Sequence, residues 1–294
     1  MIGRTLSRAV AAAGGGGVLL APAALWYGAF FILPIGFILV FSFLTSADYG
    51  GIDYKFNLGN YPQILQAPIY LRIFVNTIGM AFTGTVLCLL IGFPLAYFLA
   101  TRAGRWKSVF LVMLIVPFWT SFLTRTYAWL ILLSDNGPVA HVLHQAGLLP
   151  GDLGFLYTYK AVLMGVVYNY LPLMIFPLYV SLERLDKRLL EAAKDLGAGR
   201  LQAFRRITVP LTMPGILTGC LLVFIPLMGE YVIPAILGGA KSYMIGNLIG
   251  DEFVSAHDWA FGSALGMSVI VLLMALIAIY FRVARRASNV EMSL

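Results

Sequence analysis

Charged residues are scarce in this chain of 294 residues: only 11% are Asp, Glu, Lys or Arg, whereas 60% are hydrophobic. Soluble domains carry about 25% charged residues. The mean hydropathy is +0.88, so the composition excludes an ordinary soluble domain. It predicts an integral membrane protein.

Cysteine and histidine are also rare, with two and three residues respectively. Cys88 and Cys220 both fall inside apolar runs, where a thiol behaves as a small apolar side chain. No disulfide framework or redox chemistry is therefore predicted. His141 and His144 lie three residues apart without a nearby carboxylate or cysteine, a pattern more typical of a surface pair than of a metal site.

Motifs for ATP hydrolysis and for nucleophilic catalysis are missing as well. The phosphate-binding pattern G-x-x-x-x-G-K-[ST] does not occur, and its nearest look-alike, GGAKS at 238–242, lacks the required glycine spacing. The pattern H-E-x-x-H is absent, and serine and acidic residues form no recognisable nucleophile motif. We predict that the chain is not an enzyme in its own right and has no catalytic residue, metal site or cofactor of its own.

What the chain does have is apolar runs long enough, at about 20 residues, to cross the hydrocarbon core as helices. Six are found, at 18–43, 74–100, 109–133, 161–182, 213–237 and 264–281. None alternates in the manner of a membrane β-strand. The predicted fold is all-α, a polytopic membrane protein with six transmembrane helices.

The first run needs comparison with a secretory signal, because Ala21-Pro22-Ala23 resembles a small-residue cleavage site. The apolar segment of a signal peptide is about 7 to 15 residues long. This run is much longer, so we expect an uncleaved first helix.

Basic residues are distributed unevenly over the loops between these runs. If the N-terminus is cytoplasmic, 15 of the 20 fall in the two terminal segments and in the loops 101–108 and 183–212. They are Arg4, Arg8, Arg102, Arg105, Lys107, Arg184, Lys187, Arg188, Lys194, Arg200, Arg205, Arg206, Arg282, Arg285 and Arg286. Short cytoplasmic loops are enriched in Lys and Arg, so both termini are predicted to be cytoplasmic. Topology also accounts for the net charge of +7 without a nucleic-acid partner.

One polar segment, EAAKDLGAGRLQAFRRITVP at 191–210, interrupts the apolar pattern. Leu189, Leu190, Ala193, Leu196 and Gly197 recur at the spacing of one helical face. The glycines of Gly197-Ala198-Gly199 favour a helix end, and a second short helix follows up to Pro210. Two short helices joined by a glycine turn suit a groove on a partner protein, although a cytoplasmic loop with helical propensity fits the same pattern.

The spacing of this segment is similar to the EAA loop, EAA-x3-G-x9-I-x-L-P, of permease subunits of type I ATP-binding-cassette importers. The matching residues are Glu191, Ala192, Ala193, Gly197, Ile207 and Pro210, with Val209 in place of the usual leucine. The resemblance implies that Glu191, Ala192, Ala193 and Gly197 dock on a separate ATP-binding subunit and couple its closure to the membrane helices. It also implies a type I transmembrane domain at 74–281, preceded by a tail, first helix and outer loop at 1–73 and followed by a cytoplasmic tail at 282–294.

Two further stretches, WTSFLTRTYAWLILLSDNGPVA at 119–140 and GEYVIPAILGGAKSYMIGNLI at 229–249, resemble the spermidine/putrescine permease group. Permeases for opines, phosphonates and related solutes belong to the same group. Membership implies the bacterial inner membrane and transport by alternating access. It also implies a set of partners: two ATP-binding subunits that hold ATP and Mg²⁺, a second permease chain, a periplasmic or tethered binding protein, a small cationic solute and membrane lipid.

The outer loops themselves carry more acids than bases. Seven acids, Asp48, Asp53, Asp135, Asp152, Asp251, Glu252 and Asp258, face four bases, Lys55, Arg72, Lys160 and Lys241. A net negative outer face suits a cationic solute. The same excess of acids is explained if the membrane topology simply keeps basic residues out of the outer loops.

Two charges fall within the predicted spans, Glu230 in the fifth and Arg125 in the third. A charge near the bilayer centre costs about 3 kcal/mol even on the lenient insertion scale, so both are candidates for the translocation pathway, with Tyr231, Asn169 and Tyr168 as weaker ones. The alternatives are a structural Glu230–Arg125 pair or positions near an interface. Two other classes stay open: a stand-alone secondary carrier that uses Glu230 as an ion site, and a membrane assembly subunit that transports nothing.

Overall fold

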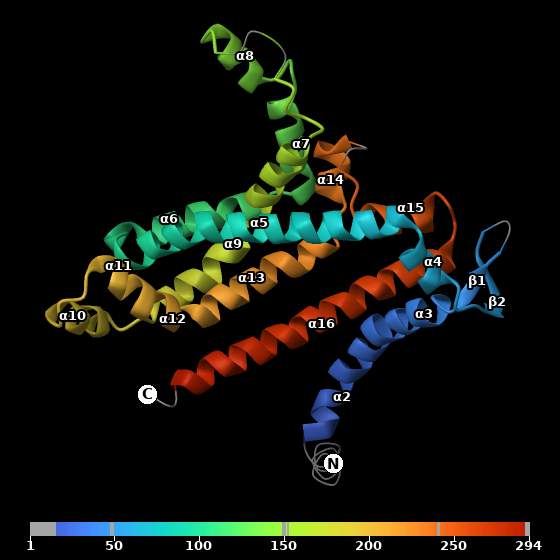
Figure 1. The fold of residues 1–294 in the computed structure, drawn as a ribbon, viewed down its shortest axis with the longest axis horizontal. Helices are drawn as coiled ribbons and strands as arrows, with labels where there is room; N and C mark the ends of the chain where they lie inside the picture. Colours follow the sequence, from blue (N-terminus) through green and yellow to red (C-terminus); the bar gives the residue numbers. More distant parts are fainter. Residues whose placement is uncertain (1–15, 48–49, 149–150, 152, 240–241, 292–294) are drawn as a thin grey trace, which may run out of the picture. The chain divides into compact units, whose positions relative to one another are not determined.

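The computed structural model describes residues 16–47, 50–148, 151, 153–239 and 242–291, drawn as a ribbon in Figure 1. The chain divides into two compact units. One combines the chain up to Gln66 with Asp251–Ile270, and the other contains Ala67–Gly250 and the chain from Val271 on. Arg4, Arg8, Asp48, Asp152 and Lys241, which enter the charge counts above, lie outside the described residues.

The first unit begins with the first predicted span. It is a helix of three parts, α2 (Gly16–Tyr27), the π-helical turn Gly28–Ile32 and α3 (Leu33–Phe41). The π turn lies just before Pro34, whose ring excludes the usual hydrogen bond to the carbonyl four residues earlier. The side chains of this span are largely exposed, as expected of a helix that faces lipid.

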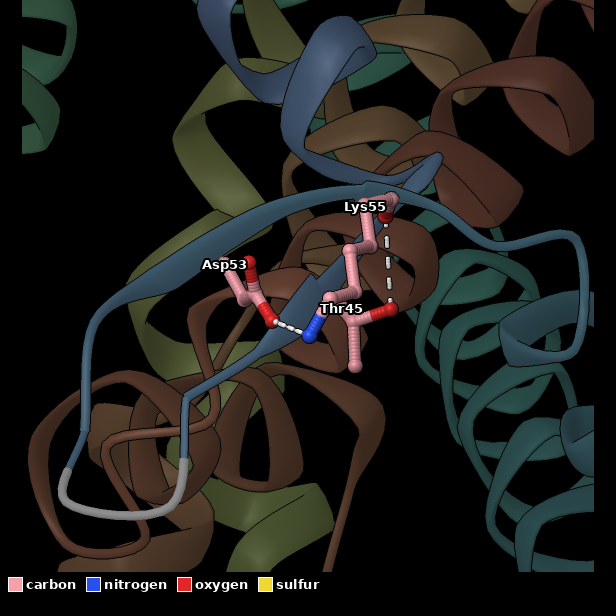
Figure 2. A network of polar contacts seen from close by, with 3 residues as sticks. All are labelled: Thr45, Asp53 and Lys55. Carbon is pink, nitrogen blue, oxygen red and sulfur yellow. Dashed lines mark hydrogen bonds and ion pairs between the residues drawn. The ribbon is translucent and has the colours of Figure 1, made fainter.

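A short antiparallel hairpin follows in the same unit, made of β1 (Leu44–Ser46) and β2 (Ile52–Phe56), with Thr45 opposite Asp53. Figure 2 shows the polar contacts on it: Thr45 donates to the Lys55 carbonyl at 3.3 Å, and Lys55 pairs with Asp53 at 2.7 Å. The hydrogen bond to Asp53 raises the pKa of Lys55. Asn60, at the start of α4 (Asn60–Gln66), donates to the carbonyls of Ser42 and Leu44 at 3.0 Å each and fixes the base of the hairpin.

The second unit is built on three helices that pack against one another, α5 (Pro68–Thr101), α9 (Tyr159–Glu183) and α13 (Met213–Met228). Their common core holds fully buried side chains, among them Met80, Met174, Ile175, Leu178 and Leu227. Membrane helices approach closely where one of them carries a small residue. At Gly215 of α13, an added Cβ would meet the Ser181 side chain and lie 2.7 Å from the Pro177 carbonyl oxygen.

We therefore expect Gly215→Ala to destabilise the unit, by about 1 to 3 kcal/mol, because the backbone of α9 must shift to admit the methyl group. Gly79→Ala on α5 is the matched control, since nothing lies within 4 Å of a Cβ there. Thermal unfolding of the purified variants in detergent measures both. Equal melting temperatures would contradict the close contact of α13 with α9.

The remaining elements complete the described part of the chain. They are the 3-10 turns Gly104–Trp106 and Val116–Trp119, α6 (Lys107–Ile115), α7 (Phe122–Leu133), α8 (Pro138–Gln145), α10 (Lys187–Asp195), α11 (Arg200–Ala203), the π-helical turn Phe204–Thr208, α12 (Val209–Leu211), α14 (Val232–Leu237), α15 (Ile245–Val254) and α16 (Trp259–Glu291). The all-α prediction is thus confirmed, with one small hairpin added.

Four of the predicted spans are single helices long and apolar enough to cross a membrane: Leu20–Phe41, Pro68–Thr101, Tyr159–Glu183 and Trp259–Arg282. Two bent pairs accompany them in the described residues. Gly104–Trp119 joins Phe122–Gln145 at 92°, and Arg200–Leu211 joins Met213–Met228 at 64°. The total is six spans if each pair crosses once, in agreement with the predicted number.

The prediction of a single helix at 109–133 is wrong. Thr120 and Ser121 have ψ angles of 152° and 136°, so the chain is extended there and turns sharply. Pro117, four residues before Ser121, leaves that part of the helix without one backbone donor.

The prediction of a single helix at 213–237 is also wrong, because α13 ends at Met228 and α14 begins only at Val232. Pro226 occupies the last turn of α13 and the break falls on Gly229-Glu230-Tyr231. An added Cβ at Gly246 of α15 would lie 2.8 Å from the Gly229 carbonyl oxygen and 2.9 Å from that of Glu230. The absence of a side chain at Gly246 lets α15 pack directly on the backbone of the break.

Candidate functional site

The predicted amphipathic helix of the polar segment is present as α10 (Figure 1). Asp186 caps its N-terminus, where the side chain accepts the backbone N–H of Arg188 at 2.9 Å. Such a cap satisfies one of the amide groups left free in the first turn. The helix therefore begins two residues before the apolar stripe that the sequence predicts.

Gly197 ends α10 in a left-handed conformation, with φ of +80°. The N–H of Gly197 donates to the Lys194 carbonyl at 2.9 Å and the N–H of Ala198 donates to the Ala193 carbonyl at 2.9 Å, which is the Schellman arrangement. This conformation costs a side chain about 1 to 2 kcal/mol, so the motif glycine has a local structural reason. Gly199 has φ of −66° and does not use its conformational freedom.

The second short helix runs from Arg200 through Leu211, one residue beyond the predicted end at Pro210. Ala203 and Thr208 on it are buried. Phe204 packs edge-on against Phe93 of α5, with ring centroids 5.5 Å apart, and against Tyr97 at 6.5 Å. These contacts hold the segment against the end of α5.

The outward side of the segment is unusually apolar. Leu196 is 89% exposed, Leu201 69% and Leu189 47%. Glu191, Ala192, Gly197 and Pro210 are exposed, while Ala193 and Ile207 are half-buried. Several exposed apolar side chains on one short segment suit an interaction surface, and small side chains at Ala192 and Ala193 allow close approach of a partner.

We expect Phe204→Ala to loosen this segment, at a cost of roughly 2 to 3 kcal/mol, because a half-buried ring and two aromatic contacts are lost. Transport should fall more than membrane abundance does. Phe110→Ala is the matched control, since Phe110 forms a similar edge-on pair with Phe98 at 5.9 Å outside the segment. Equal effects of the two changes on transport would contradict the anchoring role.

The second candidate site is Glu230, at the break between α13 and α14. Its side chain is 6% exposed. One carboxylate oxygen accepts the backbone N–H groups of Val232 at 2.9 Å and Ile233 at 3.1 Å, and the other accepts the Tyr170 hydroxyl of α9. Both oxygens are thus engaged: the carboxylate caps the first turn of α14 and ties it to α9.

Tyr170 is the partner that sequence reasoning missed. The sequence predicts its neighbour Asn169 as a candidate pathway residue. In the structure Asn169 is 4% exposed and donates to the Gly165 carbonyl at 2.9 Å. A tyrosine in the fourth predicted span, near other polar residues, was the available signal. Nothing in the sequence indicated which span would bring it against Glu230.

Arg125 braces the bend of the third span and does not pair with Glu230. Its guanidinium donates to the Pro117 carbonyl at 2.7 Å and lies over the Phe118 ring, 4.8 Å from its centroid. Both partners belong to the limb before the bend, whereas Arg125 belongs to α7. Each predicted intramembrane charge therefore holds one broken span in shape.

The remaining pathway candidates lie nearer to the surface. Tyr168 is 41% exposed and packs edge-on against Trp129, at 5.4 Å between ring centroids. Tyr231 is exposed, and its carbonyl accepts from Asn247 at 2.8 Å. Whether any of these residues contacts a solute stays a prediction.

Part of the predicted negative charge of the outer loops is compensated locally. Asp53 pairs with Lys55, and Asp258 accepts hydrogen bonds from Ser46 and from the N–H of Phe261. Burial, with the nearby charges of Asp258 and Asp251, raises the pKa of Glu252. Over the described residues no group of three or more His, Cys, Asp or Glu is placed to hold a metal ion, and His141 contacts Gln145 at 3.0 Å.

Comparison with known proteins identifies the class. Residues 90–289 match the family described as binding-protein-dependent transport system inner membrane component. The spermidine/putrescine transport system permease protein PotB of Escherichia coli (strain K12) is 42% identical over 260 residues, which cover 88% of this chain and 94% of that protein. Its counterpart in Haemophilus influenzae is 39% identical over 257 residues, which cover 87% and 90%.

Solved structures show the same fold. A chain of a bacterial ABC transporter that imports the acidic polysaccharide alginate superposes with a TM-score of 0.74 at 16% identity, over 96% of this chain and 99% of that one. A chain of the inward-facing MetNI methionine ABC transporter gives 0.54 at 17% identity, over 74% and 95%.

The chain belongs to the family of inner membrane components of binding-protein-dependent transport systems, because that model matches more than half of its length. It is a transmembrane permease subunit with the fold of type I ATP-binding-cassette importers. The family model starts at residue 90, inside α5, so the predicted domain limits at 74 and 281 stay predictions.

Proposed function

We propose that this chain is the permease subunit through which a binding-protein-dependent importer moves polyamines of the spermidine/putrescine class into the cytoplasm. The observation that carries the proposal is the 42% identity with PotB, which extends over nearly the whole length of both proteins. Identity at this level along the spans and loops supports a shared solute class.

Residues 187–211, which we call the coupling segment, suggest the partners of the permease subunit. An ATP-binding subunit, which holds ATP and Mg²⁺, takes α10 into a cleft, with Glu191, Ala192, Ala193 and Gly197 at the contact. The exposed leucines next to these residues support a buried protein contact. Phe204 packs against Phe93 of α5. Closure of two ATP-binding subunits therefore moves the coupling segment together with the transmembrane core and drives alternating access.

The same segment supports the orientation. It must lie on the side of the ATP-binding subunit, which places both termini in the cytoplasm if the six spans each cross once. The concentration of Lys and Arg on that side agrees. The binding protein and a second permease chain complete the assembly, and the solute reaches the pathway from the outer face.

One alternative function is an importer of the same class for an opine, phosphonate or other small solute. It differs from the proposed function only in the ligand. A stand-alone carrier with Glu230 as its ion site is disfavoured, because both carboxylate oxygens are used inside the fold. Among the predicted pathway residues, the exposed Tyr231 and Tyr168 fit solute contact best, while Glu230 and Arg125 shape the spans that surround it.

ATP hydrolysis tests the proposal. The complex is purified through a tag on this chain together with the products of neighbouring genes, and its ATPase rate is measured with binding protein, with and without spermidine. Stimulation by spermidine is expected. An ATPase rate that is unchanged by spermidine would indicate another solute of the same importer class. The absence of any co-purifying ATPase would overturn the importer assembly.

A further inference from the structure

Three arginines form a cluster on the second short helix of the coupling segment. Arg200, Arg205 and Arg206 line a shallow depression of about 740 Å³ together with Gly199, Leu201 and Gln202. All three arginines are exposed. No acidic residue lines the depression, so the arginine cluster is a site of concentrated positive charge.

The fold supplies no counter-charge to the arginine cluster. Over the described residues the ion pairs are Lys55–Asp53 and Lys107–Glu183, and neither involves it. Like charges within one or two helical turns repel one another. An external anion that enters the depression therefore gains both the attraction of three guanidinium groups and relief of their repulsion.

The arginines stay exposed on a helix that packs other residues on the core. Phe204 contacts Phe93 and Tyr97 of α5, and Ala203 and Thr208 are buried. Arg205 and Arg206 follow Phe204 directly yet stay exposed. The charge of the helix thus lies outside its contacts with the bundle.

The bend limits how far the cluster lies from the start of the apolar span along the axis of α13. The segment Arg200–Leu211 makes an angle of 64° with Met213–Met228. With a rise of about 1.5 Å per residue, Arg206 is about 9 Å and Arg200 about 18 Å along the helix from Thr212. Projected on the axis of α13, these lengths become about 4 and 8 Å. The headgroup layer on one side of a bilayer is about 5 to 7 Å thick.

We propose that the arginine cluster binds the phosphate groups of anionic phospholipids in the cytoplasmic leaflet and holds the coupling segment at the membrane surface. The orientation rests on the proposed function. Guanidinium groups bind phosphate through paired hydrogen bonds, and basic residues next to a membrane helix attract anionic lipid. Along the axis of α13 the cluster lies about 4 to 8 Å from Thr212, at the start of the apolar span, a length comparable with the headgroup layer, whereas the proposed contact with an ATP-binding subunit is on the exposed α10.

The test is lipid retention. The full chain, reconstituted in a mixture of phosphatidylcholine and phosphatidylglycerol and then extracted in mild detergent, is weighed with its bound lipid by native mass spectrometry. The variant Arg200→Gln/Arg205→Gln/Arg206→Gln is compared with Arg72→Gln/Arg102→Gln/Lys160→Gln, which removes as many exposed charges from scattered positions. We expect phosphatidylglycerol affinity to fall on the order of fivefold per arginine of the cluster, and to change little in the control.

Three results would overturn the proposal: unchanged retention in the cluster variant, equal losses in both variants, or release of the lipid by millimolar inorganic phosphate. Loss of ATP-binding subunit without loss of lipid would instead make the cluster a protein contact, which also contradicts it. Retention needs neither ATP nor solute, so a negative ATPase assay leaves this test intact. Labelling of Gln202→Cys by an impermeant thiol reagent from outside the cell would overturn the cytoplasmic assignment alone.

Discussion

Gly197→Asp is expected to abolish ATP-driven transport while the chain remains in the membrane. The glycine ends α10 with φ of +80° and has nothing within 4 Å of a Cβ, so the isolated subunit tolerates a short side chain at a cost of about 1 to 2 kcal/mol. In the proposed complex with an ATP-binding subunit, the same carboxylate would be buried at the contact, where an unpaired charge is costly. Loss of a central interface contact of this kind costs at least about 2 kcal/mol of binding free energy. This corresponds to a roughly 30-fold lower affinity for the ATP-binding subunit.

The matched variants are Gly197→Asn and Gly197→Ala. Asparagine has nearly the shape of aspartate and tolerates the left-handed conformation, so it should retain more transport than aspartate does. Alanine tests the backbone strain alone. Uptake by membrane vesicles and co-purification of the ATP-binding subunit measure the effect. Wild-type uptake by the aspartate variant would refute the docking role of the EAA-like loop.

Glu230→Ala should cause a large loss of stability. It leaves the N–H groups of Val232 and Ile233 and the Tyr170 hydroxyl without their acceptor. Each buried unsatisfied group costs about 1 to 3 kcal/mol, so the loss of the acceptor for three groups should cost at least about 3 kcal/mol. Thermal unfolding in detergent measures it.

Three further variants separate the contributions to this effect. Glu230→Gln keeps one oxygen for the two N–H groups, and its NH2 group can donate to the Tyr170 hydroxyl in place of the charged hydrogen bond, so its cost should be lower, about 1 to 2 kcal/mol. Tyr170→Phe should cost a similar amount. Glu191→Ala is the matched control, because Glu191 is exposed and its loss should change the unfolding temperature little. If Glu230→Ala unfolds at the wild-type temperature, the carboxylate does not stabilise α14.

Transport kinetics of Glu230→Gln distinguish a structural from a pathway role. A raised KM for solute in a fully folded variant assigns Glu230 to the pathway. Unchanged KM with a lowered melting temperature assigns it to the fold alone, and the contacts of both oxygens lead us to expect this second result.

Local signals in the sequence were enough to predict the first helix of the coupling segment and its end. The apolar stripe through Leu189, Ala193 and Leu196 predicted α10, and the glycine after it predicted the helix end. Both depend on residues within one or two turns, where periodicity and backbone sterics act without tertiary help. Gly199, in contrast, lies in the same motif and takes an ordinary conformation, because one left-handed residue already reverses the chain.

The two broken spans were not predictable from apolar runs. Hydropathy measures whether a segment tolerates lipid, and it does not register a break whose polar groups are satisfied inside the bundle. At 120–121 the break is held by Arg125 across the bend, and at 229–231 it is held by Glu230 and by Tyr170, sixty residues away. A charge in a span was correctly recognised as exceptional, but its partner depended on packing.

The sequence by itself determined the membrane class, six apolar spans, the uneven distribution of basic residues and the short amphipathic helix that ends at Gly197, because composition and short-range periodicity are enough for each of these. Only the tertiary structure decided that Glu230 and Arg125 contact separate breaks, and that the chain bends by 64° at Thr212. Those features depend on which helices meet and at what angle, and contacts between residues far apart in the chain set both.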